Sequence, residues 1–195
     1  MTQQADGNPS GAELLTVGHG THTADGFAAL LRSAGVRSVV DVRIAPGSRR
    51  FPHFGRDALA GWLPAAGVSY RWERRLGGFR TLPPGSPDVA LRNESFRAYA
   101  AHMRGTEFTA AMTGLAEAAA AERTAVMCSE SVWWRCHRRL IADHARLIEQ
   151  LAVWHLMPDG RLAEHQLTDG VRVRQHELVY DRLPGADPLP FPDAG

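Results

Sequence analysis

The sequence predicts an α/β domain with a mostly parallel central sheet of about five strands, helices on both faces and a small C-terminal addition. Short apolar runs alternate with amphipathic helical stretches along residues 13–182, as is typical of βαβ units. Strands that are joined through helices run parallel, because each crossover returns the chain to the same end of the sheet. The chain has 195 residues and a hydrophobic content of 44%, which is enough to bury one core without disulfides.

The first half of the domain alternates strand and helix signals. Predicted strands occupy residues 14–17, 36–42 and 68–72, and predicted helices occupy residues 23–34 and 57–66. Thr23 is a favourable N-cap for the first helix, and Gly35 ends it. The loop 43–55 contains Pro46 and Pro52, which exclude a regular helix there.

Residues 94–156 continue the alternation of helices and strands, whereas the stretch after them has no clear periodicity. The predicted elements are an Ala-rich helical segment at 94–121 that breaks near Gly105, strands at 124–127 and 151–156, and a helix at 136–150 between them. The stretch 158–180 is expected to form the small addition, with one short helix and a final strand at 178–180.

Both ends of the chain are expected to lie outside the domain. Residues 1–12 are polar and are expected to be flexible, and the proline-rich residues 183–195 are expected to be disordered. No stretch reaches the roughly 18 apolar residues of a membrane helix, and the first residues lack the pattern of a signal peptide. We therefore expect a cytoplasmic protein with no membrane partner and with reduced cysteines.

The positive charge is carried by arginine alone and is concentrated in three segments. The net charge is +1, and all 22 basic residues are arginine. Segments 43–56, 71–80 and 135–139 hold 11 of them and a single acid, Glu73. Each segment follows a predicted strand, so all three are expected at the carboxyl edge of the sheet. Because guanidinium groups bind phosphate in a bidentate manner, we expect a nucleic-acid partner.

Side chains that can do chemistry also follow the strand ends. His19 follows the first strand, Asp41 and Arg43 end the second, and Cys128 and Glu130 follow the fourth. Ligands of parallel α/β sheets bind at the carboxyl ends of the strands, so we expect these residues to surround one cleft.

Four sequence blocks, each after a predicted strand, resemble one known family. TVGHG, DVRIAPGSRRFPHF, LGG and MCSESVWWRCHRRLIADH, in this order, resemble the domain of unknown function 488 family over roughly residues 14–180. The family usually has Ser at the position of Gly20 and commonly has Ala at the position of Ser129, and both exchanges are between small residues. The resemblance implies excision of a modified or oxidised pyrimidine base from DNA, which is the activity of a DNA glycosylase in base-excision repair.

The residues themselves suit hydrolysis of an N-glycosidic bond. Asp41 and Glu130 are candidates for a pair that activates water and stabilises a cationic sugar, with His19 moving a proton. The alternative for Asp41 is a structural pairing with Arg43. Without lysine the chain cannot form a lysine Schiff base, so the glycosylase is expected to be monofunctional unless the N-terminal amine serves instead. The residues expected to bind the phosphates and the base are Arg43, Ser48, Arg49, Gly77, Gly78, Trp133, Trp134, Arg135, His137 and Arg138.

Two other functions fit the same residues. A domain that binds an anion or nucleic acid without chemistry would use the same arginine-rich edge. A thiol-dependent enzyme would use Cys136, because a helix N-terminus and the flanking Arg135 and His137 are expected to lower its pKa. We expect no metal or cofactor, because the chain has only two cysteines and the adjacent Cys136 and His137 are not expected to reach one ion.

Overall fold

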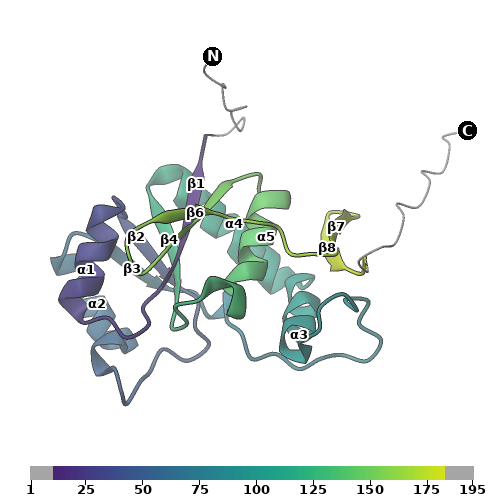
Figure 1. Ribbon diagram of the computed structural model, residues 1–195, viewed down its shortest axis with the longest axis horizontal. Coiled ribbons are helices and arrows are strands. Elements are labelled where there is room, and N and C mark those ends of the chain that lie inside the picture. Colours follow the sequence, from purple (N-terminus) through teal and green to yellow (C-terminus); the bar gives the residue numbers. More distant parts are fainter. Residues whose placement is uncertain (1–10, 183–195) are drawn as a thin grey trace, which may run out of the picture.

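The structure, a computed structural model that describes residues 11–182, confirms the predicted α/β class. Except for residues 11 and 12, the segment that we expected to be flexible lies outside the described residues, as does the predicted C-terminal tail. The central sheet has the order β3-β2-β4-β1-β5-β6, and only β6 is antiparallel to its neighbour (Figure 1). Its strands are β1 (Glu13–Gly18), β2 (Ser38–Asp41), β3 (Ser69–Trp72), β4 (Thr124–Cys128), β5 (Ala152–Leu156) and β6 (Leu162–Glu164).

Among the described residues, five α-helices connect or flank these strands, namely α1 (Ala24–Ser33), α2 (Arg56–Ala65), α3 (Glu94–Met103), α4 (Thr106–Ala121) and α5 (Arg138–Leu147). Two of them, α1 and α3, begin at a residue whose side chain caps the helix. The hydroxyl of Thr23 accepts a hydrogen bond from the backbone N–H of Gly26, which caps α1. Gly105 is the N-cap of α4, so the predicted helical segment divides there into α3 and α4. No helix within residues 11–182 combines the length and the apolar character needed to cross a bilayer.

The sheet separates two apolar cores, with helices on both faces (Figure 1). Leu15 and Val17 of β1 pack into the core that contains the apolar sides of α1 and α2. Leu14 packs on the opposite face with residues of α4 and α5. Side chains alternate between the faces of a strand, so a strand covered on both faces must be apolar at successive positions. This burial fixes the carboxyl ends of β1, β2 and β4 beside one another.

The C-terminal addition differs from the prediction. Residues 158–180 contain β6 and a hairpin of β7 (Val171–Arg174) and β8 (Glu177–Tyr180), and no helix. Strand β6 adds to the free edge of β5. Gln175 and His176 connect β7 and β8 with φ angles of 49° and 68°, as a two-residue hairpin turn requires. The sequence does predict the strand at 178–180, which lies within β8, but it does not predict β6 or β7, and the short helix expected in this stretch is absent.

A buried chain of hydrogen bonds ties this addition to the sheet. The hydroxyl of Thr16 lies 2.6 Å from His155 Nδ1, and His155 Nε2 lies 3.0 Å from His165 Nδ1. His165 Nε2 donates to Asp143 of α5 at 2.9 Å, and this carboxylate also accepts from the hydroxyl of Tyr180. Because a carboxylate only accepts, Nε2 of His165 carries a hydrogen, which fixes the direction of the last hydrogen bond in this chain. Burial lowers the pKa of His155 to about 3.

Candidate functional site

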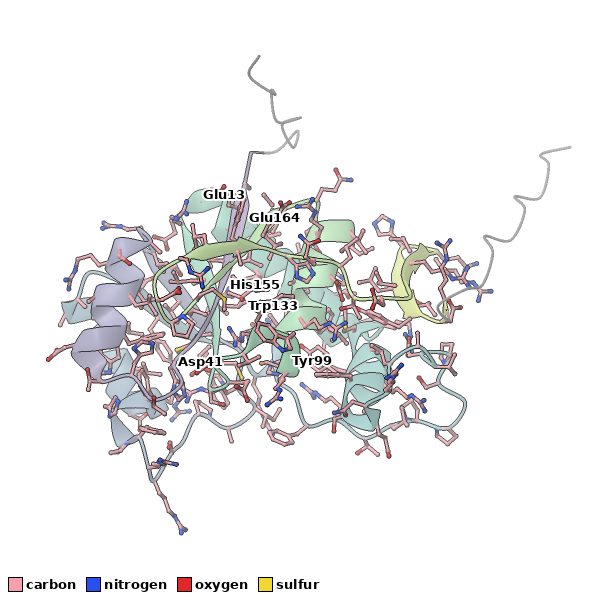
Figure 2. The ribbon with its side chains drawn as sticks, viewed as in Figure 1. Glu13, Asp41, Tyr99, Trp133, His155 and Glu164 are labelled. Carbon is pink, nitrogen blue, oxygen red and sulfur yellow. The ribbon has the colours of Figure 1, made fainter. Side chains whose placement is uncertain are left out.

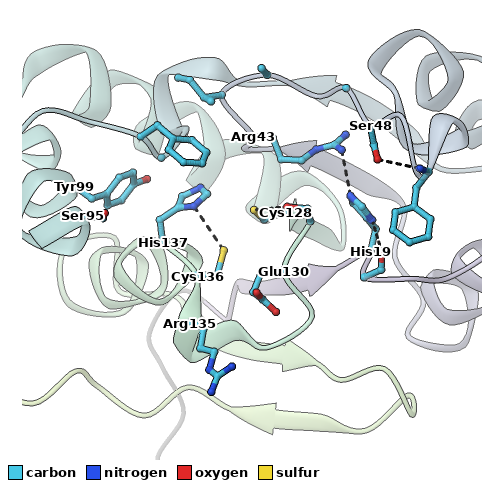
Figure 3. Close-up of a pocket in the computed structure, with 18 of the residues that line it drawn as sticks. His19, Arg43, Ser48, Ser95, Tyr99, Cys128, Glu130, Arg135, Cys136 and His137 are labelled. Carbon is cyan, nitrogen blue, oxygen red and sulfur yellow. Dashed lines mark hydrogen bonds between the residues drawn. The ribbon is translucent and has the colours of Figure 1, made fainter. Parts of the chain in front are cut away.

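A pocket of about 520 Å³ opens beside the carboxyl ends of β1, β2 and β4 (Figure 3). Its wall combines the loops that follow these strands with one side of α3. The backbone N–H of His19 donates to the carbonyl of Cys128 at 3.0 Å, which extends the pairing of β1 with β4 beyond the strands. The predicted convergence of separate segments therefore occurs, and the pocket is of the size that holds a small-molecule ligand.

Asp41 does not line this pocket. Its side chain is 0% exposed, and it forms an ion pair with Arg43 in which Oδ2 lies 2.6 Å from Nη2. Oδ1 accepts from Nε of the same arginine at 2.8 Å, and the hydroxyl of Tyr70 donates to Oδ2 at 2.9 Å. The prediction that Asp41 and Glu130 face one cleft is therefore wrong. The structural pairing with Arg43, the alternative that the sequence allowed, is the arrangement present, because a buried carboxylate needs a close counter-ion.

Arg43 connects this buried ion pair to the pocket wall. Its Nη1 donates to Nε2 of His19 at 3.2 Å, and Nδ1 of His19 donates to the carbonyl of Gly20 at 3.1 Å. Burial, followed by the charge of Arg43, lowers the pKa of His19 to about 4. The imidazole also stacks on Phe54, with ring centroids 4.1 Å apart. At neutral pH His19 is therefore a neutral, fixed part of the wall whose two ring nitrogens are already engaged.

Glu130 is exposed, and in the described part of the chain it is the sole carboxylate that lines the pocket. Its position depends on Gly18, because a Cβ atom at Gly18 would overlap the carbonyl oxygen of Glu130. The side chain of Arg138 donates to the same carbonyl oxygen. The loop after β4 therefore packs directly on the end of β1 and presents the Glu130 carboxylate to the pocket (Figure 3).

Cys128, Cys136 and His137 meet at the wall of the pocket (Figure 3). Their ligand atoms, two sulfurs and one imidazole nitrogen, all lie within 4.8 Å of one another. Sγ of Cys136 is 3.6 Å from Nδ1 of His137, and Nε2 of His137 is 3.0 Å from the carbonyl of Val42. A carbonyl only accepts, so Nε2 carries the hydrogen and the lone pair of Nδ1 faces the sulfur.

Arg138 supplies positive charge to this cluster. Its side chain is 1% exposed, and its Nε donates to Sγ of Cys136 at 3.4 Å. A hydrogen bond from Cys128, helped by the charge of Arg138, lowers the pKa of Cys136 to about 6. The same hydrogen bond, together with burial, raises the pKa of Cys128. The shared hydrogen bond therefore makes Cys136 the more acidic of the two thiols.

The structure brings most, but not all, of the predicted site residues to the pocket. Those in its lining are His19, Arg43, Ser48, Gly78, Glu130, Arg135, Cys136 and His137. Those outside its lining are Asp41, Arg49, Gly77, Trp133, Trp134 and Arg138. The ring of Trp133 stacks on His155 with centroids 3.9 Å apart, whereas Trp134 is 48% exposed (Figure 2 shows Trp133 and His155). Only one of the two adjacent tryptophans is thus available to a ligand.

The arginine-rich segments are less available than their composition indicates. Arg75 pairs with Glu73, and Arg80 donates to backbone carbonyls. Arg139 donates to the hydroxyl of Thr168. Glu73 lies within the same segment as Arg75, so local composition shows this pairing. Thr168 is distant from Arg139 in the chain and the partners of Arg80 are backbone carbonyls, so local composition does not show these contacts. Among the predicted phosphate contacts, Arg49 and Arg135 are the exposed ones.

Part of the lining was not predicted as site. Phe79, Phe96 and Tyr99 line the pocket, and Phe79 is 94% exposed. Phe96 and Tyr99 are three residues apart on α3, a spacing that also describes an ordinary core face. The hydroxyl of Tyr99 donates to the carbonyl of Leu76 at 2.7 Å, so its ring is held in place. Helical periodicity shows that two side chains share a face, but it does not show what that face contacts.

Comparison with known proteins identifies one family. The model of the family described as "Domain of unknown function DUF488" matches residues 23–145. No curated protein and no solved structure matches the chain.

Proposed function

This chain belongs to the DUF488 family, whose description assigns no activity, and we propose that it is a hydrolase of N-glycosidic bonds in nucleic acid. That the released base is a modified or oxidised pyrimidine is what the family resemblance implies. The observation that carries the proposal is a lone lining carboxylate, Glu130, in a pocket walled by aromatic rings. A nucleobase is flat and aromatic, so it suits such walls, and cleavage of its bond to sugar develops positive charge that a carboxylate stabilises.

Glu130 has two roles in this proposal. Its carboxylate polarises the attacking water and lies close to the positive charge that develops on the sugar. Asp41 supports the reaction only through position, since it holds Arg43 and thereby His19 in the wall. Water is the nucleophile, because the chain has no lysine to form a Schiff base.

Exposed side chains near the pocket suit a nucleic-acid strand. Phe79 and Arg135 line the pocket, and Trp134 precedes Arg135 with an exposed ring. Exposed aromatic rings stack on bases, worth about 1–3 kcal/mol per base, and guanidinium groups contact phosphates. A base taken out of the stack would enter the pocket while Arg135 holds the flanking backbone.

The test is base release from oligonucleotide duplexes that carry single oxidised or modified pyrimidines, with alkali used to cleave the abasic sites. We expect product with at least one such base, and we expect Glu130→Gln to lower the rate at least about 100-fold. Glu117→Gln is the matched control, because Glu117 is exposed on α4 outside the lining. A folded protein that releases no base from any of these duplexes would contradict the proposal.

The same experiment separates the two rival functions. A non-catalytic binding domain would show salt-dependent binding that survives Glu130→Gln, with no product. A thiol-dependent enzyme would leave part of the substrate attached to Cys136 during turnover, which mass spectrometry of the quenched reaction detects.

A further inference from the structure

We propose that Cys128, Cys136 and His137 form a binding site for a single zinc-like divalent metal ion at the wall of the pocket. The sequence alone led us to expect no such site, because neighbouring residues rarely ligate one ion. The folded arrangement differs, since the two sulfurs and the imidazole nitrogen lie within 4.8 Å of one another.

The distances match those of a tetrahedral zinc site. With Zn–S near 2.3 Å and Zn–N near 2.05 Å, tetrahedral angles place S and N about 3.6 Å apart and two sulfurs about 3.8 Å apart. The sulfur of Cys136 and Nδ1 of His137 are 3.6 Å apart. Since all three ligand atoms lie within 4.8 Å, no pair has to approach by more than about 1 Å.

The imidazole is already oriented as a ligand. Metal-binding histidines usually donate their other ring N–H to a carbonyl or carboxylate, which fixes the tautomer and the ring direction. In His137 the partner is the carbonyl of Val42, 3.0 Å from Nε2, so Nδ1 presents its lone pair to the sulfurs. Gly78 covers the ring closely, because a Cβ atom there would lie 3.2 Å from Nδ1.

A buried positive charge borders the cluster. Arg138 is buried, and within residues 11–182 no carboxylate lies in ion-pair distance of its guanidinium. An unpaired buried charge is costly, and the sulfur of Cys136 is the side-chain atom to which Arg138 donates.

The site has the form of a reactive metal centre. Three protein ligands leave a position open for water, as in catalytic rather than structural zinc sites, and both sulfurs border the pocket. A metal ion there would lower the pKa of a bound water in the same pocket as Glu130. This consequence rests on the proposed function, whereas the binding of the ion does not.

Titration of the reduced full-length protein with Co²⁺ tests the site directly. We expect about one ion per chain with thiolate-to-cobalt charge-transfer absorption, which Zn²⁺ then abolishes by displacement. Cys136→Ser and His137→Ala are expected to weaken binding at least about tenfold. His22→Ala, a histidine outside the cluster, should bind as the unchanged protein does.

A second measurement uses only the unchanged protein, in case a substitution prevents folding. Zn²⁺ is expected to protect Cys136 from iodoacetamide, with the modified fraction read by mass spectrometry. Equal alkylation with and without Zn²⁺, or Co²⁺ binding without charge-transfer absorption, would overturn the metal site. Neither readout requires a substrate. A protein that binds the metal ion but releases no base would therefore contradict the proposed hydrolysis and leave the metal site standing.

Discussion

Replacement of Asp41 by asparagine tests whether this residue acts through structure or through chemistry. The carboxylate is fully buried and neutralises Arg43, which is itself 7% exposed. Oδ1 accepts from the backbone N–H and Nε of Arg43, and Oδ2 accepts from its Nη2 and from Tyr70. Each carboxylate oxygen of Asp41 faces two donors. In either orientation of an asparagine amide, its N–H₂ group would therefore replace one of these oxygens and face two donors that need an acceptor.

The expected cost follows from the loss of the counter-ion. Removing one partner of a buried ion pair destabilises a protein by about 3–5 kcal/mol, because the other charge stays buried and unpaired. For a domain of this size, each kcal/mol lowers Tm by about 2–4 °C, so we expect a fall of roughly 6–20 °C.

Urea unfolding followed by tryptophan fluorescence measures this cost. The control is Asp57→Asn, since Asp57 pairs with Arg56 on the surface and its side chain is 90% exposed. The control should change the free energy of unfolding by less than about 0.5 kcal/mol. If Asp41→Asn keeps the stability of the unchanged protein but loses activity, the positioning role is refuted and Asp41 takes part in the chemistry.

Three further predictions concern other parts of the fold. His155 has its pKa lowered to about 3 by burial, so the unfolded chain binds its proton more readily. The free energy of unfolding should then fall as the pH drops below about 6.5, and His155 alone should contribute about 1.4 kcal/mol per pH unit to this fall. Urea unfolding curves that coincide at pH 7 and pH 5 would contradict this prediction. Gly18→Ala should lower the free energy of unfolding by about 1–3 kcal/mol, because the alanine Cβ would overlap the carbonyl oxygen of Glu130. An unchanged Tm would contradict this, because it would show that the loop after β4 moves away at no cost. Tyr180→Phe removes the hydroxyl that donates to Asp143 and should lower the free energy of unfolding by about 1.5–3 kcal/mol, as measured by urea unfolding. Tyr70→Phe, which removes the hydroxyl donor to buried Asp41, is measured alongside it and should have a similar effect.

Strand and helix positions in this protein follow from local periodicity and local backbone chemistry, which the amino-acid sequence shows directly. Apolar runs predicted four of the five parallel strands, because a strand covered on both faces is apolar throughout, and alternation predicted β3 at the edge of the sheet. Thr23 and Gly105 marked where α1 and α4 begin, since capping depends on neighbours within one turn. The rule that parallel strands end at a common edge was enough to bring His19, Arg43 and Glu130 to one pocket.

What each side chain at that edge contacts depends on the folded arrangement of the loops. Asp41 is buried against Arg43, Trp133 stacks on His155, and Cys128 lies beside Cys136 and His137. The pairing of β8 with β7 in a hairpin likewise appears only in the fold, although the sequence predicts the strand at 178–180. Such contacts join residues distant in the chain, and they depend on how loops fold back over the strand ends. Local composition identifies the groups that are present, but burial and partner geometry settle their charge and their role.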